Sequence, residues 1–140
     1  MAVYNKVEKF VEDLAKKVHD CHGDTFKVYL TNATPNNATN AIKADLAEIT
    51  AGNGYTAGGV DTQNTVSRSG GTVTVNAVDL TITASGGSVG PFRYVPLYND
   101  TPTSPADPLI ANWDYGSALT LATGETFTVD FGSNSFFTLA

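Results

Sequence analysis

The chain has 140 residues, of which 41% are hydrophobic and 16% charged, and its formal net charge is −6. This length suits a single domain, 1–140, that buries about two-thirds of the surface its unfolded chain exposes. Residues 51–140 contain only Arg68 and Arg93 against seven acidic residues. A region so poor in cations repels phosphate backbones, so we expect no nucleic acid as a partner. The chain has no run of about 18 apolar residues, so we expect no membrane span either.

Residues 4–20 have the pattern of an amphipathic helix, which we assign to an N-terminal helical part, 1–22. Its apolar positions recur at spacings of three and four and therefore share one face: Val7, Phe10, Val11, Leu14 and Val18. Asn5 is the expected N-cap, and Gly23 supplies the expected stop signal. The apolar face is expected to cover either the protein's own sheet or a partner.

Residues 25–140 have the features of a β domain. Apolar and polar residues alternate over 26–30, which predicts a half-buried strand. The segment 41–52 fits either a short helix or an extended stretch. The glycine-rich stretch that follows, 52–64, predicts a surface loop or an arm that reaches a neighbour.

The remaining sequence predicts strand after strand. The apolar residues change from odd to even positions near residues 76–77, so they would move to the other face of a regular strand. This change indicates a bulge or a tight turn. Pro96 lacks an amide donor, so its strand is predicted to be an edge strand or to break there. Residues 119–121 and 127–131 flank a turn and predict a hairpin. The short strands and frequent turns predict a mainly β fold, a jelly-roll-like or Greek-key β-sandwich with one N-terminal helix.

The stretch "VHDCHGDTF" (18–26) gathers both histidines and the only cysteine of the chain. A zinc site on His19 and His22 would need further ligands, and no other histidine or cysteine follows. Cys21 and His22 are adjacent on the predicted helix and project about 100° apart, which disfavours a shared proton. We interpret the stretch as a helix end, where histidine interacts with the negative end of the helix dipole. We therefore expect no metal and no cofactor.

No serine–histidine–aspartate order and no nucleophile elbow is visible, so we do not expect an enzyme. Trp113, together with Tyr94, Tyr98 and Tyr115, fits two interpretations. The rings form either a platform on which sugars stack or part of the core or of a protein interface.

Several stretches resemble small structural proteins of tailed bacteriophages: 1–20, "AGNGYTAGG" (51–59), "GPFRYVPLYNDTPTSPADPLIANWDYG" (90–116) and "GETFTVDFG" (124–132). Within that group, the chain resembles capsid cement, or decoration, proteins of the Bordetella phage type. The resemblance implies a jelly-roll-like domain on the outside of an icosahedral head, made in the bacterial host cytoplasm. It also implies two partners, the major capsid protein and a second copy of the chain in a homo-oligomer such as a dimer. It supplies no functional residues.

In such a protein, the helix face, the glycine-rich loop and the strand with Pro96 are candidate contact surfaces. The candidate interface residues are therefore Val7, Phe10, Val11, Leu14, Tyr55, Pro96 and Trp113. The alternative function is a head-fibre or tail-associated module that binds a host receptor or glycan through Trp113 and the tyrosines.

Overall fold

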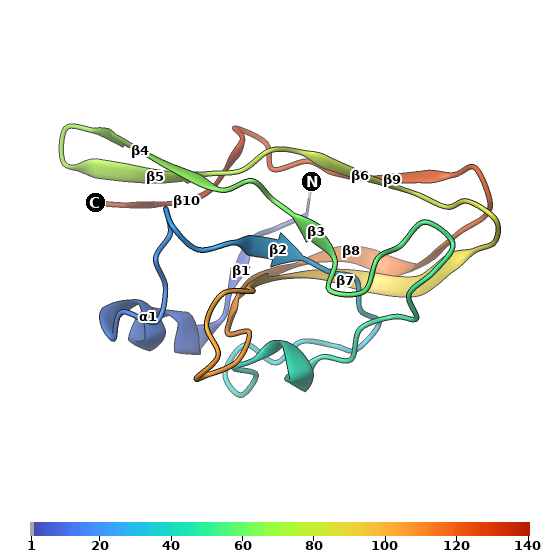
Figure 1. Cartoon of the computed structure of the whole chain (residues 1–140), viewed down its shortest axis with the longest axis horizontal. Helices are drawn as coiled ribbons and strands as arrows, with labels where there is room; N and C mark the ends of the chain where they lie inside the picture. Colours follow the sequence, from blue (N-terminus) through green and yellow to red (C-terminus); the bar gives the residue numbers. More distant parts are fainter. Residues whose placement is uncertain (1) are drawn as a thin grey trace.

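The computed structural model describes residues 2–140, and it is a sandwich of antiparallel strands with one α-helix near the N-terminus (Figure 1). One layer is a five-stranded sheet in the order β1-β8-β7-β2-β3. Its strands are Asn5–Lys6 (β1), Leu109–Leu121 (β8), Val89–Asn99 (β7), Phe26–Val28 (β2) and Val60–Asp61 (β3). Such a non-sequential strand order is typical of Greek-key and jelly-roll sandwiches. The prediction of a mainly β sandwich with an N-terminal helix is confirmed.

The second layer contains a three-stranded sheet, β10-β5-β4, and a two-stranded sheet, β6-β9. Its strands are Thr65–Ser69 (β4), Thr72–Asn76 (β5), Leu80–Thr83 (β6), Thr126–Val129 (β9) and Ser135–Leu139 (β10). Because β5 pairs with β10 and β6 with β9, the two pairs form one long antiparallel ladder with an interruption. The irregularity predicted near residues 76–77 lies there: Ala77 and Leu80 are buried, whereas Val78 between them is 49% exposed.

The helix α1, Glu8–Ala15, is shorter than the predicted 4–20. Asn5 pairs with Asn112 of β8 as part of β1, so it is not the N-cap. Val7 takes that position, and its amide donates to the carbonyl of Ile110. The helix ends at Ala15, eight residues before Gly23, and Lys17 just beyond it adopts a φ of +64°. Both predicted helix limits are wrong because backbone pairing with β8 at one end and a left-handed residue at the other stop the helical ladder.

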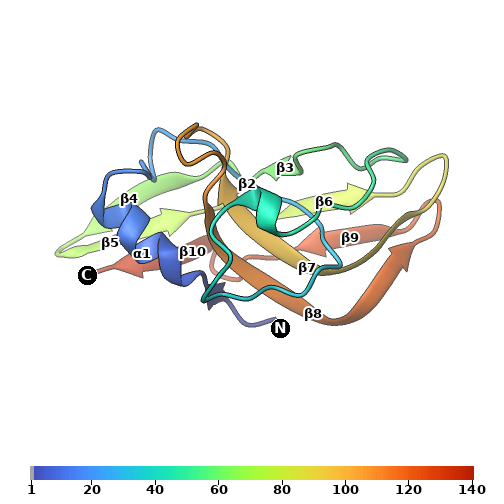
Figure 2. The same ribbon diagram turned by 90° about the horizontal axis from the view of Figure 1, so that it is seen from below.

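Residues from both layers form the main core, and a smaller cluster lies on the outer face of the five-stranded sheet. The smaller cluster consists of Val7, Tyr29, Leu46, Tyr98 and Leu109. Tyr29 is completely buried, although the alternation over 26–30 predicts a half-buried strand. The reason is that the 3₁₀ helix η1 (Lys43–Asp45) and the chain around it cover this face, as Figure 2 shows from below.

Pro96 lies in the central strand β7, between β8 and β2, so the prediction of an edge strand is wrong. Its carbonyl accepts a hydrogen bond from the amide of Tyr29, but it has no N–H to return. Regular pairing of β2 with β7 stops at Val28 and resumes at the bridge between Thr31 and Tyr94. A central strand tolerates this proline because only one ladder bond is lost.

The predicted hairpin of 119–121 with 127–131 is also wrong. A turn is present, since the amide of Glu125 donates to the carbonyl of Ala122 at 2.9 Å. However, β8 pairs with β7, and β9 pairs with β6. The turn therefore carries the chain from one layer of the sandwich to the other, which apolar alternation within each strand does not reveal.

Candidate functional site: an aromatic groove beside an unpaired strand edge

The outer edge of β8 is only briefly covered. The strand β1 pairs with Ala111 and Asn112, and among residues 2–140 no strand pairs with that edge from Trp113 to Leu121. In Figure 2, β8 runs along the lower side of the molecule. An unpaired edge offers backbone donors and acceptors to an extended segment of another chain.

A bulge in β8 lies on this stretch. Tyr94 of β7 is opposite Asp114, and Phe92 is opposite Leu119, so β8 contains three more residues than β7 between these pairs. The guanidinium of Arg93 donates to both carboxylate oxygens of Asp114, at 2.8 and 3.0 Å. The amide of Gly116, whose φ is +104°, also donates to Asp114. The bulge thereby holds Tyr115 outward, 53% exposed.

Beside the bulge lies a cavity of about 270 Å³ between β8 and β9. Val95 and Val129 contribute apolar surface to it, and Trp113, Tyr115 and Phe127 contribute aromatic surface. The Tyr115 and Phe127 ring centroids are 5.8 Å apart, edge to face.

A second cavity of about 190 Å³ shares Ala2, Trp113 and Asp130 with the first. We call the two cavities together the aromatic groove, and its aromatic residues are Tyr4, Trp113, Tyr115, Phe127, Phe131 and Phe136. Burial raises the pKa of Tyr4, so its phenol stays neutral at physiological pH.

Of the residues 2–140 that line the aromatic groove, Asp130 is the one with a charged side chain. Its Oδ1 accepts the amide of Gly132 at 2.7 Å, which orients the carboxylate. Residues 94–140 contain no lysine or arginine and five acidic residues. The electrostatic potential at the groove is therefore expected to be negative and to attract cations.

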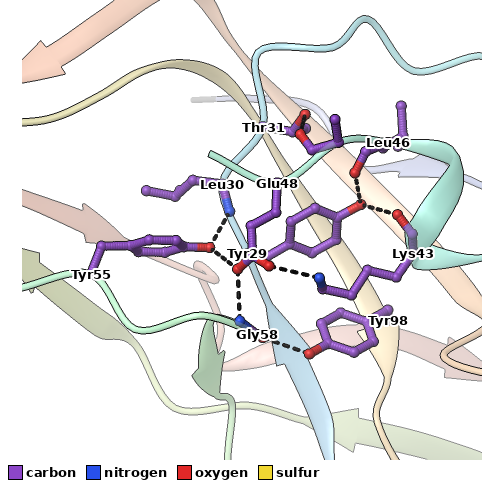
Figure 3. A network of polar contacts seen from close by, with 10 residues as sticks. Tyr29, Leu30, Thr31, Lys43, Leu46, Glu48, Tyr55, Gly58 and Tyr98 are labelled. Atoms are coloured by element: carbon purple, nitrogen blue, oxygen red, sulfur yellow. Dashed lines mark hydrogen bonds and ion pairs between the residues drawn. The ribbon is translucent and has the colours of Figure 1, made fainter. Parts of the chain in front are cut away.

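Three tyrosines are arranged differently, around Glu48 (Figure 3): Tyr29 and Tyr98 belong to the smaller cluster on the outer face of the five-stranded sheet, and Tyr55 belongs to the main core. Glu48 Oε1 accepts hydrogen bonds from the Tyr55 hydroxyl and the Gly58 amide, both at 2.7 Å. Glu48 Oε2 pairs with Lys43 Nζ at 2.7 Å. Burial raises the pKa of the Glu48 carboxyl, but these hydrogen bonds outweigh burial and hold the pKa below its ordinary value.

Two further tyrosines complete this arrangement, which we call the tyrosine–glutamate cluster: Tyr29, Lys43, Glu48, Tyr55 and Tyr98. The Tyr29 hydroxyl is 3.0 Å from the carbonyl of Leu46, and the Tyr98 hydroxyl donates to the carbonyl of Gly58 at 2.5 Å. Lys43 Nζ lies 4.8 Å from the ring centroid of Tyr29 and 5.7 Å from that of Tyr98. The cation is thus held between two rings and a carboxylate.

The glycine-rich loop lies on the surface, as predicted, because most of residues 52–57 are exposed, and it is anchored to the protein's own sheet through Tyr55. Tyr55 is only 3% exposed, and its hydroxyl also accepts the amide of Leu30 at 3.0 Å. Gly59 has a φ of +84°, and a Cβ there would lie 1.9 Å from the carbonyl oxygen of Val28. Only glycine permits this close approach of two backbones.

The histidine-rich stretch lies beyond the helix, so its interpretation as a helix end is wrong. His19 is 6% exposed, and its Nδ1 is 3.1 Å from the Asn99 amide nitrogen. Burial lowers the pKa of His19. Asp20 accepts the amides of His22 and Gly23, which shapes a turn. Within residues 2–140 there is no group of three or more histidine, cysteine or acidic side chains arranged to hold a metal ion.

The structure separates the candidate interface residues into buried and accessible ones. Val7, Phe10, Tyr55 and Pro96 are buried within this chain. Leu14 is partly buried against the main core, whereas Val11 is 51% exposed. The helix face therefore covers the protein's own sandwich, chiefly through Phe10.

Trp113 lies in the aromatic groove beside Tyr115, but Tyr98 belongs to the tyrosine–glutamate cluster on the other side of the sheet. The sequence analysis missed Phe127 and Asp130 as residues of the same site. One signal was available: Gly116 interrupts an alternating strand, and a glycine inside a strand often marks a bulge.

Comparisons of the chain with protein-family profiles, with curated proteins and with solved structures found no match. None of the helices within residues 2–140 has the length and apolar character needed to cross a membrane.

Proposed function

We propose that the chain is a structural protein of a phage virion, a cement protein that binds the outside of an icosahedral capsid. In this role it stabilises contacts between major capsid protein subunits, associates with further copies of itself and catalyses no reaction. The observation that carries the proposal is the aromatic groove beside the unpaired edge of β8. The resemblance of several stretches of the sequence to capsid cement proteins favours the same role.

The physical basis is burial of surface across a joint between capsid subunits. Stable protein interfaces bury about 1,600 Å² in total, and aromatic residues such as tyrosine and tryptophan contribute much of their binding energy. The aromatic groove offers such residues on a closely packed scaffold, so little conformational entropy is lost on binding. Many copies bound around a closed shell add their effects through avidity.

The test uses phage particles prepared without this chain. Purified protein is added, and the temperature at which the particles release DNA is measured. We expect release at a higher temperature with the wild-type protein than without it. We expect Tyr115→Ala to weaken the effect, and Val78→Ala to leave it unchanged because Val78 is an exposed apolar residue outside the groove. Equal particle stability with and without the protein would contradict the proposal.

One observation favours a second candidate, a glycan-binding module of a head fibre or tail. Tyr115 is exposed at the mouth of a cavity that Asp130 also lines. An exposed ring stacks on a sugar, and a carboxylate accepts hydrogen bonds from sugar hydroxyls. Binding to a host glycan on an array, lost in Tyr115→Ala, is the expected result for this function; an array without a hit argues against it.

A further inference from the structure

We propose that the aromatic groove binds a lysine or arginine side chain of the partner, with the alkyl part against the aromatic walls and the cation at Asp130. The identification of that partner as the capsid rests on the proposed function. The chemistry of the occupant rests on the groove itself.

The tyrosine–glutamate cluster shows within the same molecule how such a site is filled. There, Lys43 Nζ lies over the rings of Tyr29 and Tyr98 and pairs with Glu48 Oε2 at 2.7 Å. The aromatic groove has two of these three components, aromatic rings and a carboxylate. Among residues 2–140 the missing component is a cation, and we infer that the partner supplies it.

The ion pairs among residues 2–140 leave the Asp130 carboxylate available to a cation of the partner. None of the ion pairs among residues 2–140 involves Asp130. Arg93, the cation nearest to the bulge in sequence, donates to both oxygens of Asp114. The groove also has the apolar surface of Val95 and Val129, against which the methylene groups of a long basic side chain pack.

The unpaired edge of β8 explains how the partner would present this side chain. An extended segment that adds to the edge beyond Asn112 runs alongside the aromatic groove. Alternate side chains of such a strand point to the same face, so one of them is directed into the groove. The backbone then contributes affinity, and the basic side chain contributes specificity.

The experiment uses the isolated protein and the fluorescence of Trp113, which is the only tryptophan in the chain. The probes are n-butylguanidinium and n-butylammonium, with 1-pentanol as a neutral probe of similar length and methyl glucoside as a sugar. We expect saturable changes with both cations, and an affinity about fivefold lower for pentanol, the factor that a cation–π and carboxylate contact at an exposed site supplies. We expect added salt to weaken the binding of the cations only.

Two matched variants locate the effect. Asp130→Asn keeps an oxygen for the Gly132 amide but removes the charge, so it should lower cation affinity towards that of pentanol and leave only the preference that the rings supply. Asp61→Asn is the control, because Asp61 likewise accepts an amide two residues ahead, that of Gln63, and lies in β3 at the opposite edge of the sheet. It should bind the cations like the wild type. Chemical unfolding of both variants verifies that they are folded.

Equal affinity of the wild type for the cations and pentanol overturns the inference without any variant, as does a response to methyl glucoside alone. Unchanged cation binding in Asp130→Asn overturns it too. These measurements need no capsid, so their failure is separable from failure of the proposed function. Cation binding by a protein that does not stabilise particles would leave this inference in place and contradict the cement role.

Discussion

The tyrosine–glutamate cluster and the aromatic groove contain similar side chains but differ in what completes them. In the cluster, every tyrosine hydroxyl has an acceptor within the chain, and Lys43 neutralises the carboxylate of Glu48. In the groove, Tyr115 is 53% exposed and Asp130 has no ion-pair partner among residues 2–140. The first region fixes a long connection onto the sheet, and the second is open to a partner.

This difference shows that residue type alone does not distinguish a residue with a structural role from one with a binding role. Buried phenols and charges are costly unless they are paired, so a completed set of hydrogen bonds indicates a structural role. Exposed rings next to an unpaired carboxylate retain the capacity to gain contacts on binding. The three experiments below change corresponding residues in the two regions.

The largest effect is expected when the same substitution is made in each region. Tyr29→Ala removes a completely buried ring together with its hydroxyl and should cost about 3–5 kcal/mol of unfolding free energy, as for other buried aromatic residues. Tyr115→Ala should change the unfolding free energy by less than about 0.5 kcal/mol, because the side chain is largely exposed. Urea unfolding of the two variants measures both values. Similar costs would show that the groove is as structural as the cluster.

An intermediate effect is expected for Glu48→Gln. The amide keeps an acceptor for Tyr55 and Gly58 but loses the charge that pairs with Lys43, which should cost about 1–3 kcal/mol at neutral pH. Because folding lowers the pKa of Glu48 below 4.5, its stabilising contribution is present above the ordinary pKa and is lost as pH falls through the lower, folded-state pKa.

The pH dependence sharpens the assignment to Glu48. Unfolding free energies of wild type and Glu48→Gln, measured from neutral to acidic pH, should converge as the carboxyl of the wild type becomes protonated. Other carboxylates titrate in both proteins and cancel in the difference. A difference that stays constant with pH would mean that the charge of Glu48 does not contribute.

The smallest effect on stability is expected for Asp114→Ala, which releases Arg93 and the Gly116 amide from the bulge. Both side chains of this ion pair are partly exposed, so the unfolding midpoint should hardly move. The Trp113 emission and the affinity of the groove for its probes should change, because the bulge positions Tyr115. Asp100→Ala, which breaks the exposed pair with Lys27, is the control and should leave the emission unchanged.

Parts of the fold were predictable because they depend on local alternation. The strands around Val75, Phe92 and Phe127 follow apolar periodicity, and the parity change near residues 76–77 marks the interruption of the second layer. The helix limits were not predictable from the apolar stripe, since pairing of Asn5 with β8 competes with helix formation. The position of Pro96 also depends on its neighbours rather than on its own backbone.

The candidate site was predictable only in part. Trp113 and Tyr115 belong to one strand. A shared aromatic surface that contains both was one of the two interpretations that the sequence leaves open. Phe127 and Asp130 come from β9 and the chain after it, which the sequence pattern pairs with β8 in a hairpin. Because the turn at 122–125 crosses between layers, these residues instead face the edge of β8 across the groove.

The order of apolar and polar residues by itself determined that this chain is mainly β with one N-terminal helix, because alternation of period two and spacings of three and four need no knowledge of distant contacts. The tertiary structure decided which tyrosines are buried with a hydrogen-bond partner and which are exposed to a partner protein. Whether a phenol or a carboxylate is satisfied depends on groups far away in the sequence, such as Gly58 for Tyr98. Asp130 and Tyr115 face an open groove for the same reason: folding brings rings and a carboxylate together there, and residues 2–140 place no cation beside them.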